Sequence, residues 1–258
     1  MRAEISPAFR PIWDAEGGFE GLFGIDGELY RQAPGRRTLR FVRHGKSYFV
    51  KIHSGAGWLE ILKNLVTLRL PVLGAANEFE AIRHLERVGL AAPKWVAYAR
   101  KGINPAARRS LIVTEDIGES VSLEDLCKDW SRHPPPFAFK RALISEVAET
   151  ARRMHGSGTN HRDFYLCHFL RSQADGRLYV IDLHRAQIRR QVPPRWRVKD
   201  IGGLYFSAMD IGLTRRDLLR FVRAYSGRPL RDALAGSAGF WRAVERRAER
   251  LYSSYPAK

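Results

Sequence analysis

The sequence has 258 residues, of which 45% are hydrophobic, and 44 Lys and Arg residues outnumber 27 Asp and Glu residues to give a formal net charge of +17. This composition indicates a globular chain with one large core or two smaller lobes, because a chain of this length can bury enough apolar surface for either. No run approaches the roughly 18 apolar residues of a membrane-spanning helix, and the first residues lack the apolar stretch of a secretory signal, so we expect a cytoplasmic protein.

Cysteine usage excludes two further classes of protein. Only Cys127 and Cys167 are present, too few for a disulfide framework and without the CxxC spacing of a structural zinc site. We expect both thiols to be reduced.

The excess of positive charge has two interpretations. Such a surface attracts polyanions, and nucleic acid, a phosphorylated glycolipid, the inner leaflet of a membrane and a small acidic protein are equivalent at this level. Alternatively, arginine outnumbers lysine as codon bias in a GC-rich genome would produce, and part of the charge then has no function. Composition alone does not choose between the two.

The first predicted elements are a hairpin and a helix. Residues 38–43 (TLRFVR) and 47–53 (SYFVKIH) are rich in β-forming residues and are separated by HGK, which predicts an antiparallel hairpin. Residues 57–70 (GWLEILKNLVTLRL) place apolar residues at helical spacing, with polar residues on the other side. We expect this amphipathic helix to pack on the core, with a membrane or partner surface as the alternative.

A second helix is predicted over 77–89, where Asn77 and Glu80 have the spacing of a capping box and a glycine ends the pattern. Two further strands are predicted at 94–100 and 109–115.

The character of the chain changes after residue 116. A helix is predicted to begin at Ser122, a run of prolines at 134–136 breaks the chain, and a long helix covers 137–155. On one face this long helix carries Leu143, Val147, Ala151 and Met154. A short buried strand is predicted at 178–186, and amphipathic helices follow at 197–209, 214–224 and 239–252.

Strands therefore segregate from helices along the chain. This layout indicates an α+β fold with two lobes. We expect a mostly β N-terminal lobe over residues 1–116 and a mostly α C-terminal lobe over residues 117–258.

Four charged residues match the needs of phosphoryl transfer from a nucleotide. That chemistry requires a cation on the phosphates, an anion that holds this cation, carboxylates on magnesium and a base for the acceptor hydroxyl. Lys51 lies within a predicted strand, where a half-buried ammonium calls for an anionic partner, and Glu78 lies at the start of the following helix. Asp163 lies in a loop after the long helix and Asp182 at a strand end, so the two carboxylates can converge on one cleft.

Each of these residues also has a structural alternative. The strand lysine can reach solvent, Glu78 can favour the positive start of a helix, Asp163 can pair with Arg162, and Asp182 can be a turn residue. Judged singly, each is more often structural. Their joint occurrence in this order, across the change of lobe, is hard to obtain by accident.

Several stretches of the sequence carry a family resemblance. They are FVKIH (49–53), GWLEILKNL (57–65), RLPVLGAANE (69–78), HRDFYLCHFL (161–170) and VIDLHRA (180–186). Together they resemble the lipopolysaccharide core heptose kinases, bacterial relatives of the protein-kinase fold, over roughly residues 18–225.

The resemblance implies a protein-kinase-like bilobal fold and ATP-dependent phosphorylation of a heptose hydroxyl in the inner core of lipopolysaccharide, with Mg²⁺ as the metal. The implied roles are a base for Asp163, loop-shaping groups for Arg162 and His161, a metal ligand for Asp182, and phosphate-positioning groups for Lys51 and Glu78.

Two positions depart from the wider kinase pattern. The residue five positions after Asp163, usually a magnesium-binding asparagine, is His168, and the usual DFG triplet is DLH at 182–184. An imidazole suits magnesium poorly, so His168 is either a second metal ligand or a hydrogen-bond partner of Asp182 or of a phosphate oxygen.

The nucleotide loop also differs, since no GxGxxG precedes the strand lysine. The loop is predicted at 32–38, where Gly35 and Arg37 would cover the phosphates, although solvated arginines at a hairpin tip are equally consistent. The adenine-binding linker is predicted around Glu115 and Ile117, through backbone groups.

The resemblance gives the positive charge a candidate purpose. Basic stretches at 185–199 and 215–228 would bind the lipopolysaccharide core acceptor or the anionic bilayer, with the protein peripheral on the cytoplasmic face of the inner membrane. An acidic acyl carrier protein that docks on the predicted 57–70 helix is a further candidate partner, and no nucleic acid is expected.

Two rival functions stay open from sequence. A kinase of another acceptor, protein or small molecule, would keep every phosphate-handling residue. A non-catalytic polyanion-binding protein would explain the charge but leave the spacing of the four charged residues as coincidence.

Overall fold

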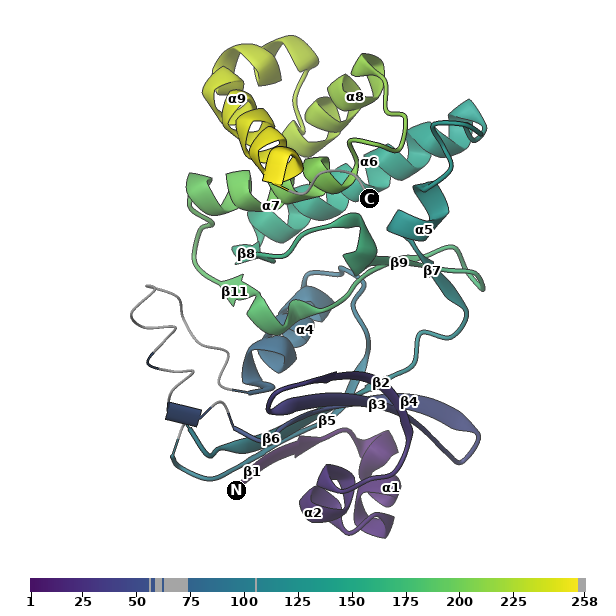
Figure 1. The fold of residues 1–258 in the computed structure, drawn as a ribbon, viewed down its shortest axis with the longest axis vertical. Coiled ribbons are helices and arrows are strands. Elements are labelled where there is room, and N and C mark those ends of the chain that lie inside the picture. Colours follow the sequence, from purple (N-terminus) through teal and green to yellow (C-terminus); the bar gives the residue numbers. More distant parts are fainter. Residues whose placement is uncertain (56, 59–61, 63–73, 105, 255–258) are drawn as a thin grey trace. The chain divides into compact units, whose positions relative to one another are not determined.

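The computed structural model describes residues 1–55, 57–58, 62, 74–104 and 106–254 (Figure 1). The chain forms two compact units. The N-terminal unit comprises Met1–His84, Ala92–Gly118 and Asp182–Arg185, and the C-terminal unit comprises Leu85–Ala91, Glu119–Ile181 and Ala186–Lys258. The N-terminal part of the chain is rich in sheet and the C-terminal part is helical, as predicted.

A six-stranded sheet in the order β1-β5-β6-β4-β3-β2 is the frame of the N-terminal unit. Every neighbouring pair is antiparallel. The strands are β1 (Arg2–Ile5), β2 (Glu28–Ala33), β3 (Arg36–Arg43), β4 (Lys46–His53), β5 (Trp95–Lys101) and β6 (Arg109–Glu115). The helices are η1 (Pro7–Phe9), α1 (Arg10–Ala15), α2 (Gly18–Phe23), α4 (Ala76–Arg87, whose last turn belongs to the C-terminal unit) and η3 (Leu183–Arg185).

The side chains of β4 alternate between the two faces of this sheet. Tyr48, Val50 and Ile52 are buried in the core cluster that includes side chains of α1 and α2. Phe49 and Lys51 therefore point to the opposite face, because successive side chains of a strand point to opposite sides. That face is covered by α4, as Figure 1 shows.

The predicted hairpin is confirmed as β3 and β4. Its turn consists of His44 and Gly45, both with a positive φ (49° and 72°). Two left-handed residues give the turn the twist that a two-residue hairpin requires.

The helix predicted over 77–89 is α4, with a different start. It begins at Ala76, so Asn77 lies in its first turn and does not cap it. Phe79, on the sheet side, stacks on Tyr98 of β5 with ring centroids 4.3 Å apart. The chain leaves the helix at Gly89, which has a left-handed φ of 69°, as expected for a terminating glycine.

The C-terminal unit contains α5 (Leu123–Cys127), α6 (Phe137–Gly156), η2 (Leu166–His168), α7 (Pro194–Ser207), α8 (Arg215–Ser226) and α9 (Leu230–Ser254). Its short strands are β7 (Ser120–Ser122), β8 (Thr159–Asn160), β9 (Phe169–Ser172), β10 (Leu178–Val180) and β11 (Gln187–Ile188). They form the sheets β10-β9-β7 and β11-β8. Helix α6 packs against α8, and α7 packs against α9.

The apolar stripe predicted for the long helix is confirmed in α6. Its four members are all buried: Leu143, Val147, Ala151 and Met154. The N-cap predicted at Ser122 is also confirmed, since its side chain accepts a hydrogen bond from the backbone of Asp125 in α5.

Helix α8 begins with a capping box. Asp217, only 4% exposed, accepts hydrogen bonds from the backbone and hydroxyl of Thr214, and its Oδ2 lies 3.1 Å from Lys140 Nζ. Burial raises the pKa of Asp217, but these donors outweigh it and lower its pKa to about 2.

Two predictions from the sequence need correction, and a third lies largely outside the described residues. The strand predicted at 178–186 ends at Val180, because the backbone of Asp182 turns into the left-handed region. Before residue 38 the only prediction is the loop at 32–38 between the first strands, whereas β1, the first helices and β2 lie there as short elements. The helix predicted at 57–70 lies largely outside the described residues.

Within the described ranges, no helix has both the length and the apolar content needed to cross a membrane.

Candidate active site

Lys51 is held between two carboxylates in the N-terminal unit. Its Nζ lies 2.5 Å from Glu78 Oε1 and 3.7 Å from Asp182 Oδ1. Burial lowers the pKa of Lys51, but the charges of Glu78 and Asp182 outweigh it, and the pKa lies above its ordinary value. The structure thus brings together three of the predicted site residues around a fixed ammonium.

Local structure explains why Glu78 meets this lysine. Strand β4 turns Lys51 toward the face that α4 covers, and Glu78 lies in the first turn of α4, where the helix dipole favours a carboxylate. The glutamate is 3% exposed, and its second oxygen, Oε2, has no hydrogen-bond partner in the part of the chain that is described. Its main electrostatic role is therefore toward the lysine.

Asp182 lies two residues beyond β10 with a φ of 59°, a conformation that is uncommon for a residue other than glycine. Its Oδ1 lies 2.6 Å from Nδ1 of His184, and its Oδ2 lies 3.7 Å from the guanidinium of Arg31. Nitrogen atoms of three side chains therefore surround this carboxylate, with Lys51 as the third.

Two histidines near Lys51 lie in the quoted stretches FVKIH and VIDLHRA, but the sequence assigns them no role. His184 is the residue bonded to Asp182. His53, at the end of β4, is buried, and its burial followed by the charges of Arg36 and Lys51 lowers its pKa to about 3. Its imidazole is therefore neutral near physiological pH.

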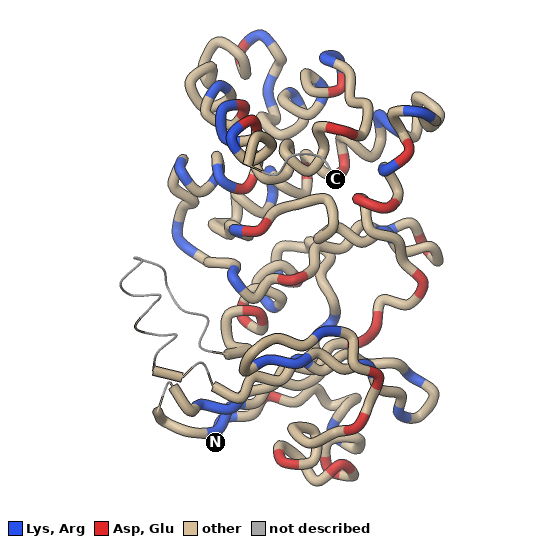
Figure 2. The backbone as a smooth tube through the Cα atoms, viewed as in Figure 1, with Lys and Arg blue, Asp and Glu red and all other residues tan. Residues whose placement is uncertain are grey.

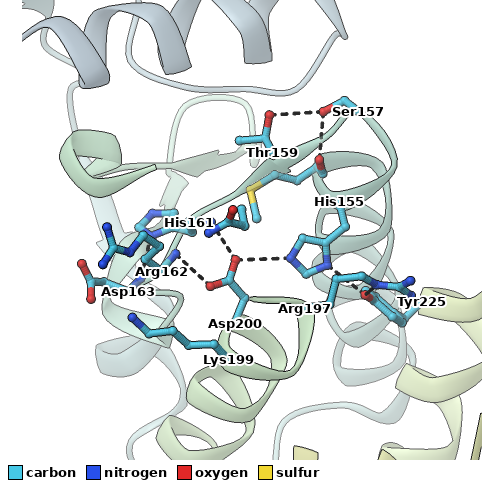
Figure 3. Close-up of polar contacts among 12 residues, drawn as sticks. His155, Ser157, Thr159, His161, Arg162, Asp163, Arg197, Lys199, Asp200 and Tyr225 are labelled. Carbon is cyan, nitrogen blue, oxygen red and sulfur yellow. Dashed lines mark hydrogen bonds and ion pairs between the residues drawn. The ribbon is translucent and has the colours of Figure 1, made fainter. Parts of the chain in front are cut away.

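The loop that carries His161, Arg162 and Asp163 is held through its backbone in the C-terminal unit (Figure 3). The backbone N–H of His161 donates to Asp200 Oδ2 at 2.6 Å, and that of Arg162 donates to Asp200 Oδ1 at 2.8 Å. Asp200, on α7, is fully buried. One carboxylate therefore fixes two consecutive peptide groups, including Arg162 with its positive φ of 78°.

The hydrogen bonds of His161 define its tautomer. Its Nε2 lies 2.9 Å from the carbonyl of Ile181, which can only accept, and its Nδ1 accepts from the backbone N–H of Asp163 at 3.3 Å. Burial lowers the pKa of this imidazole, outweighing the charges of Asp200 and Asp163. A neutral His161 therefore holds the backbone at Asp163.

His168 also contacts this loop. Its Nδ1 lies 2.6 Å from the carbonyl of Asp163, and its ring stacks on His161 with centroids 5.5 Å apart. This contact to a backbone carbonyl is one that the sequence does not indicate.

The network behind Asp200 extends to helices α6 and α8 (Figure 3). His155 Nε2 lies 3.3 Å from Asp200 Oδ2, and His155 Nδ1 lies 2.8 Å from the hydroxyl of Tyr225. Arg197 donates to the same hydroxyl at 3.0 Å. Burial raises the pKa of Tyr225 more than the guanidinium of Arg197 lowers it, so this phenol stays protonated.

The phosphate loop predicted over 32–38 is shorter in the structure, because β2 extends to Ala33 and β3 begins at Arg36, which places Arg37 within a strand. Gly35 has a φ of 68°, and a Cβ there would lie 2.7 Å from the carbonyl oxygen of Gly55, so no other residue fits without a shift. The guanidinium of Arg37 donates to the carbonyl of Phe23 at 2.5 Å, at the end of α2.

The predicted adenine linker follows β6. Glu115 pairs with Lys94 at 2.8 Å, its backbone N–H donates to the carbonyl of Lys94, and Ile117 is half-buried. Between them, Asp116 accepts from Arg40 and from the backbone of Gly118. Burial raises the pKa of Asp116, but the hydrogen bonds that it accepts have the larger effect, so the pKa lies below its ordinary value.

An apolar cavity of ≈ 440 Å³ lies among the helices of the C-terminal unit. Leucine, isoleucine, valine and aromatic side chains of α5 to α9 and of the segments between them make up most of its wall, with Trp130, Tyr205 and Trp241 as the largest aromatic residues. Its polar lining groups include Asp217 and Arg242. The sequence does not indicate this cavity, because its lining residues come from five helices and from the segments that connect them.

Comparison with known proteins identifies the relatives of this chain. The model of the "Lipopolysaccharide kinase (Kdo/WaaP) family" matches residues 22–225. The lipopolysaccharide core heptose(I) kinase WaaP of Pseudomonas aeruginosa is 51% identical, covering 98% of this chain and 96% of that protein. The kinase of the same name from Escherichia coli K12 is 46% identical, with 96% of each chain covered.

A solved structure is similar as well. The structure described as "WaaP in complex with acyl carrier protein" has a TM-score of 0.83 and 46% sequence identity, and the match covers 98% of this chain and 100% of the other. The family model matches most of the chain, the sequence and structure comparisons cover nearly all of it, and the chain belongs to the lipopolysaccharide kinase (Kdo/WaaP) family.

Proposed function

We propose that this chain is a lipopolysaccharide core heptose(I) kinase, which transfers a phosphoryl group from ATP to a heptose hydroxyl. The relatives that bear this name match nearly the full chain, and ATP use is implied by the kinase family. The observation that carries the proposal is the ammonium of Lys51, fixed between Glu78 and Asp182. Transfer from a nucleotide requires such a cation on the phosphates.

The nucleotide-binding groups come from the N-terminal unit. Lys51 binds the phosphates and Glu78 holds it in place, while Gly35 lies at the loop that covers the phosphates. Arg37 is not included, because it pairs with Ile52 on the opposite face of the sheet from Lys51 and donates to Phe23. Backbone groups near Glu115 and Ile117 receive the adenine. A half-buried ammonium with a buried carboxylate partner supports the assignment of Lys51 and Glu78 most directly.

The acceptor hydroxyl loses its proton to Asp163. Arg162 and His161 shape the loop: the bond from the N–H of Asp163 to His161 and the two bonds to Asp200 support a preorganised base. Preorganisation matters because a base that is already in position needs no reorganisation during the reaction.

Magnesium fits the carboxylates that are present. In nucleotide sites Mg²⁺ uses one or two carboxylates and completes its shell with water and phosphate oxygens. Asp182, beside Lys51, would be such a ligand, and the described residues contain no cluster of three or more His, Cys, Asp or Glu that would form an all-protein cage. Bound Mg²⁺ would neutralise phosphate charge. His168, with Nδ1 at the carbonyl of Asp163, has only Nε2 to offer a metal.

The protein-kinase-like bilobal fold follows from the same proposal. Residues 1–116 would be the nucleotide-binding N-lobe and residues 117–258 the C-lobe that carries the base and binds the acceptor. The division between a sheet-rich and a helical part supports it.

The acceptor is an anionic glycolipid in the inner leaflet, so we place the protein at the cytoplasmic face of the inner membrane. The basic stretches 185–199 and 215–228 would bind the core or the bilayer. Figure 2 shows Lys and Arg following one another along the connection from β11 into α7, which supports this assignment.

Acyl carrier protein is the proposed protein partner. The similar solved structure contains it, and the apolar cavity of the C-terminal unit offers a chemically suitable place for an acyl chain. The cavity favours this second site over the 57–70 helix that the sequence suggests. Thermal unfolding with acylated and unacylated carrier protein tests the idea, with stabilisation by the acylated form alone as the expected result.

The kinase proposal is tested with ATP labelled at the γ-phosphate and lipopolysaccharide core that lacks heptose phosphate. We expect label on the glycolipid from the wild type and a loss of about 10³-fold for Asp163→Asn, the usual contribution of a general base. Asp129→Asn, which makes the same change at an exposed position, is the control. Label only on added protein would discard the heptose acceptor, and no label from a folded, ATP-binding enzyme would discard the reaction.

A further inference from the structure

Four cationic side chains surround the indole ring of Trp196 in the C-terminal unit. The guanidinium carbons of Arg162, Arg189 and Arg195 lie 5.2, 5.6 and 5.6 Å from the ring centroid, and Lys199 Nζ lies 5.5 Å from it. We call these four cations the Trp196 cluster. They come from the catalytic loop, from the segment after β11 and from the first turns of α7.

Within this cluster, Arg189 has neutral hydrogen-bond partners and no acidic group to balance its positive charge among the described residues. The hydrogen bonds of its guanidinium go to two neutral amide oxygens, those of Asn160 and Gln187. Burial lowers the pKa of Arg189, and the charge of Arg195 lowers it further, with no acidic group acting in the opposite direction. No carboxylate of the described residues forms an ion pair with Arg189 or Arg195.

The same place contains buried donors that lack an acceptor. Asn160 is fully buried, its oxygen is taken by Arg189, and its Nδ2 has no hydrogen-bond partner among the described residues. The Nε1 of Trp196 is likewise buried without a partner in that part of the chain. Leaving buried donors unsatisfied is costly, so each such group calls for a partner, and an anionic ligand beside these cations would supply one.

The cluster lies beside the base. Arg162 directly precedes Asp163, and in Figure 3 the side chains of Arg162, Asp163 and Lys199 lie on the opposite side of Asp200 from Tyr225. The helix start at α7 adds partial positive charge where Arg195 lies. An anionic group bound by the cluster would therefore stand near the hydroxyl that Asp163 deprotonates.

We propose that the Trp196 cluster is an anion subsite that binds a carboxylate or phosphate of the glycolipid acceptor and so aligns the acceptor hydroxyl with Asp163. The inference rests on the proposed kinase function. Planar guanidinium groups suit both anions, because each can accept two parallel hydrogen bonds.

Arg195 is the position at which to test the subsite, because it is exposed and forms no ion pair with a carboxylate of the described residues. Arg195→Gln removes the charge and Arg195→Lys retains it. Arg177→Gln is the matched control: Arg177 is also exposed, belongs to the same unit, and lies 5.6 Å from the ring of Tyr179, outside the cluster. The KM for core oligosaccharide is measured with intact acceptor, with acceptor whose sugar carboxylates are reduced to alcohols, with dephosphorylated acceptor, and with acceptor treated in both ways.

We expect Arg195→Gln to raise the KM for intact acceptor about tenfold, the effect of one charge-assisted contact, with the KM for ATP unchanged. Arg195→Lys should recover most of the loss, and Arg177→Gln should match the wild type. The treated acceptor on which wild type and Arg195→Gln become equal identifies the anion as carboxylate or phosphate. Equal KM values on the intact acceptor, or an equal rise on the acceptor that lacks both groups, would overturn the proposal.

A second arm separates this inference from the kinase function itself. Calorimetric titration with inorganic phosphate, without nucleotide or acceptor, should give weaker binding for Arg195→Gln than for wild type and Arg177→Gln. If the wild type phosphorylates no core acceptor but this difference is present, the function has failed and the anion subsite stands. Identical binding isotherms for all three proteins would contradict the anion subsite, whether or not the wild type phosphorylates the core acceptor.

Discussion

Glu78 in the N-terminal unit and Asp200 in the C-terminal unit are both buried carboxylates, and they stabilise different things. Glu78 has one oxygen on the ammonium of Lys51, so it fixes the position of a charge. Asp200 accepts from the backbone N–H groups of His161 and Arg162, so it fixes a conformation. The comparison teaches that losing the first should weaken the binding of a ligand, whereas losing the second should damage the fold of the loop and catalysis together.

The largest effect is expected from Asp200→Asn. An amide NH₂ would then face a backbone N–H, and His155 would lose its anionic partner. Breaking one member of a buried charged network costs about 3–5 kcal/mol of the free energy of unfolding, and kinase activity should fall with it. Urea unfolding and the labelling assay measure both. A variant that loses activity at wild-type stability would show that Asp200 does not act through loop conformation.

Glu78→Gln tests the other buried carboxylate, the one that holds Lys51. It leaves Lys51 with Asp182 alone, so we expect kcat/KM for ATP to fall about 100-fold, equivalent to about 2.7 kcal/mol, while the urea midpoint changes little. Glu80→Gln, on the exposed side of the same helix, is the control. A loss of stability as large as that of Asp200→Asn would erase the distinction between the two carboxylates.

Asp217 sharpens the comparison, because it is a third buried carboxylate that both caps a helix and pairs with Lys140. Its pKa is lowered to about 2 in the folded state, below an unfolded value near 3.8. Its contribution is therefore fully present above pH ~4 and is lost as the pH falls through 2. We expect the stability advantage of wild type over Asp217→Asn to be on the order of 2 kcal/mol at pH 6 and to shrink toward pH 2.

Unfolding of both proteins at a series of pH values checks this expectation. Asp232→Asn, an exposed carboxylate in the first turn of α9, serves as the matched control. A difference between wild type and Asp217→Asn that is independent of pH would show that the carboxylate acts by shape alone.

The smallest effect is expected from Tyr225→Phe. It removes the hydroxyl that contacts His155 and Arg197 but keeps the ring, which stacks on Phe240 at 6.1 Å. We expect a loss of about 1 kcal/mol, the net value of one hydrogen bond, and a modest fall in kcat. Trp241→Phe, at the neighbouring ring, gives a comparison that keeps the phenol. Unchanged stability and kcat would show that the Tyr225 hydroxyl does not contribute and that the network that supports Asp200 ends at His155.

The candidate site residues could be predicted from the sequence where the pattern that indicates them is local. Lys51 and Glu78 follow from a strand pattern and a helix start, and their pairing across 27 positions needs only the alternation of β4 and the next helix. Asp163 and Asp182 lie in short motifs. Their catalytic and metal-binding roles stay predictions that the assays above decide.

The supports behind these residues could not be read from sequence. The contacts of Asp200 with His161 and with His155 span 39 and 45 positions, and that of His155 with Tyr225 spans 70. No periodicity encodes which helices will meet. The only local signal was an acidic residue on the buried side of an amphipathic helix, a position that calls for polar partners without naming them.

Asp200 accepts hydrogen bonds from backbone N–H groups, which every amino acid except proline has. These two hydrogen bonds are therefore independent of the side chains at 161 and 162, whereas the contact from the N–H of Asp163 to the His161 imidazole and the positive φ of Arg162 still depend on those residues. A library designed to change the sugar specificity could therefore vary the exposed residues around Trp196 while it keeps positions 161, 162 and 200 unchanged.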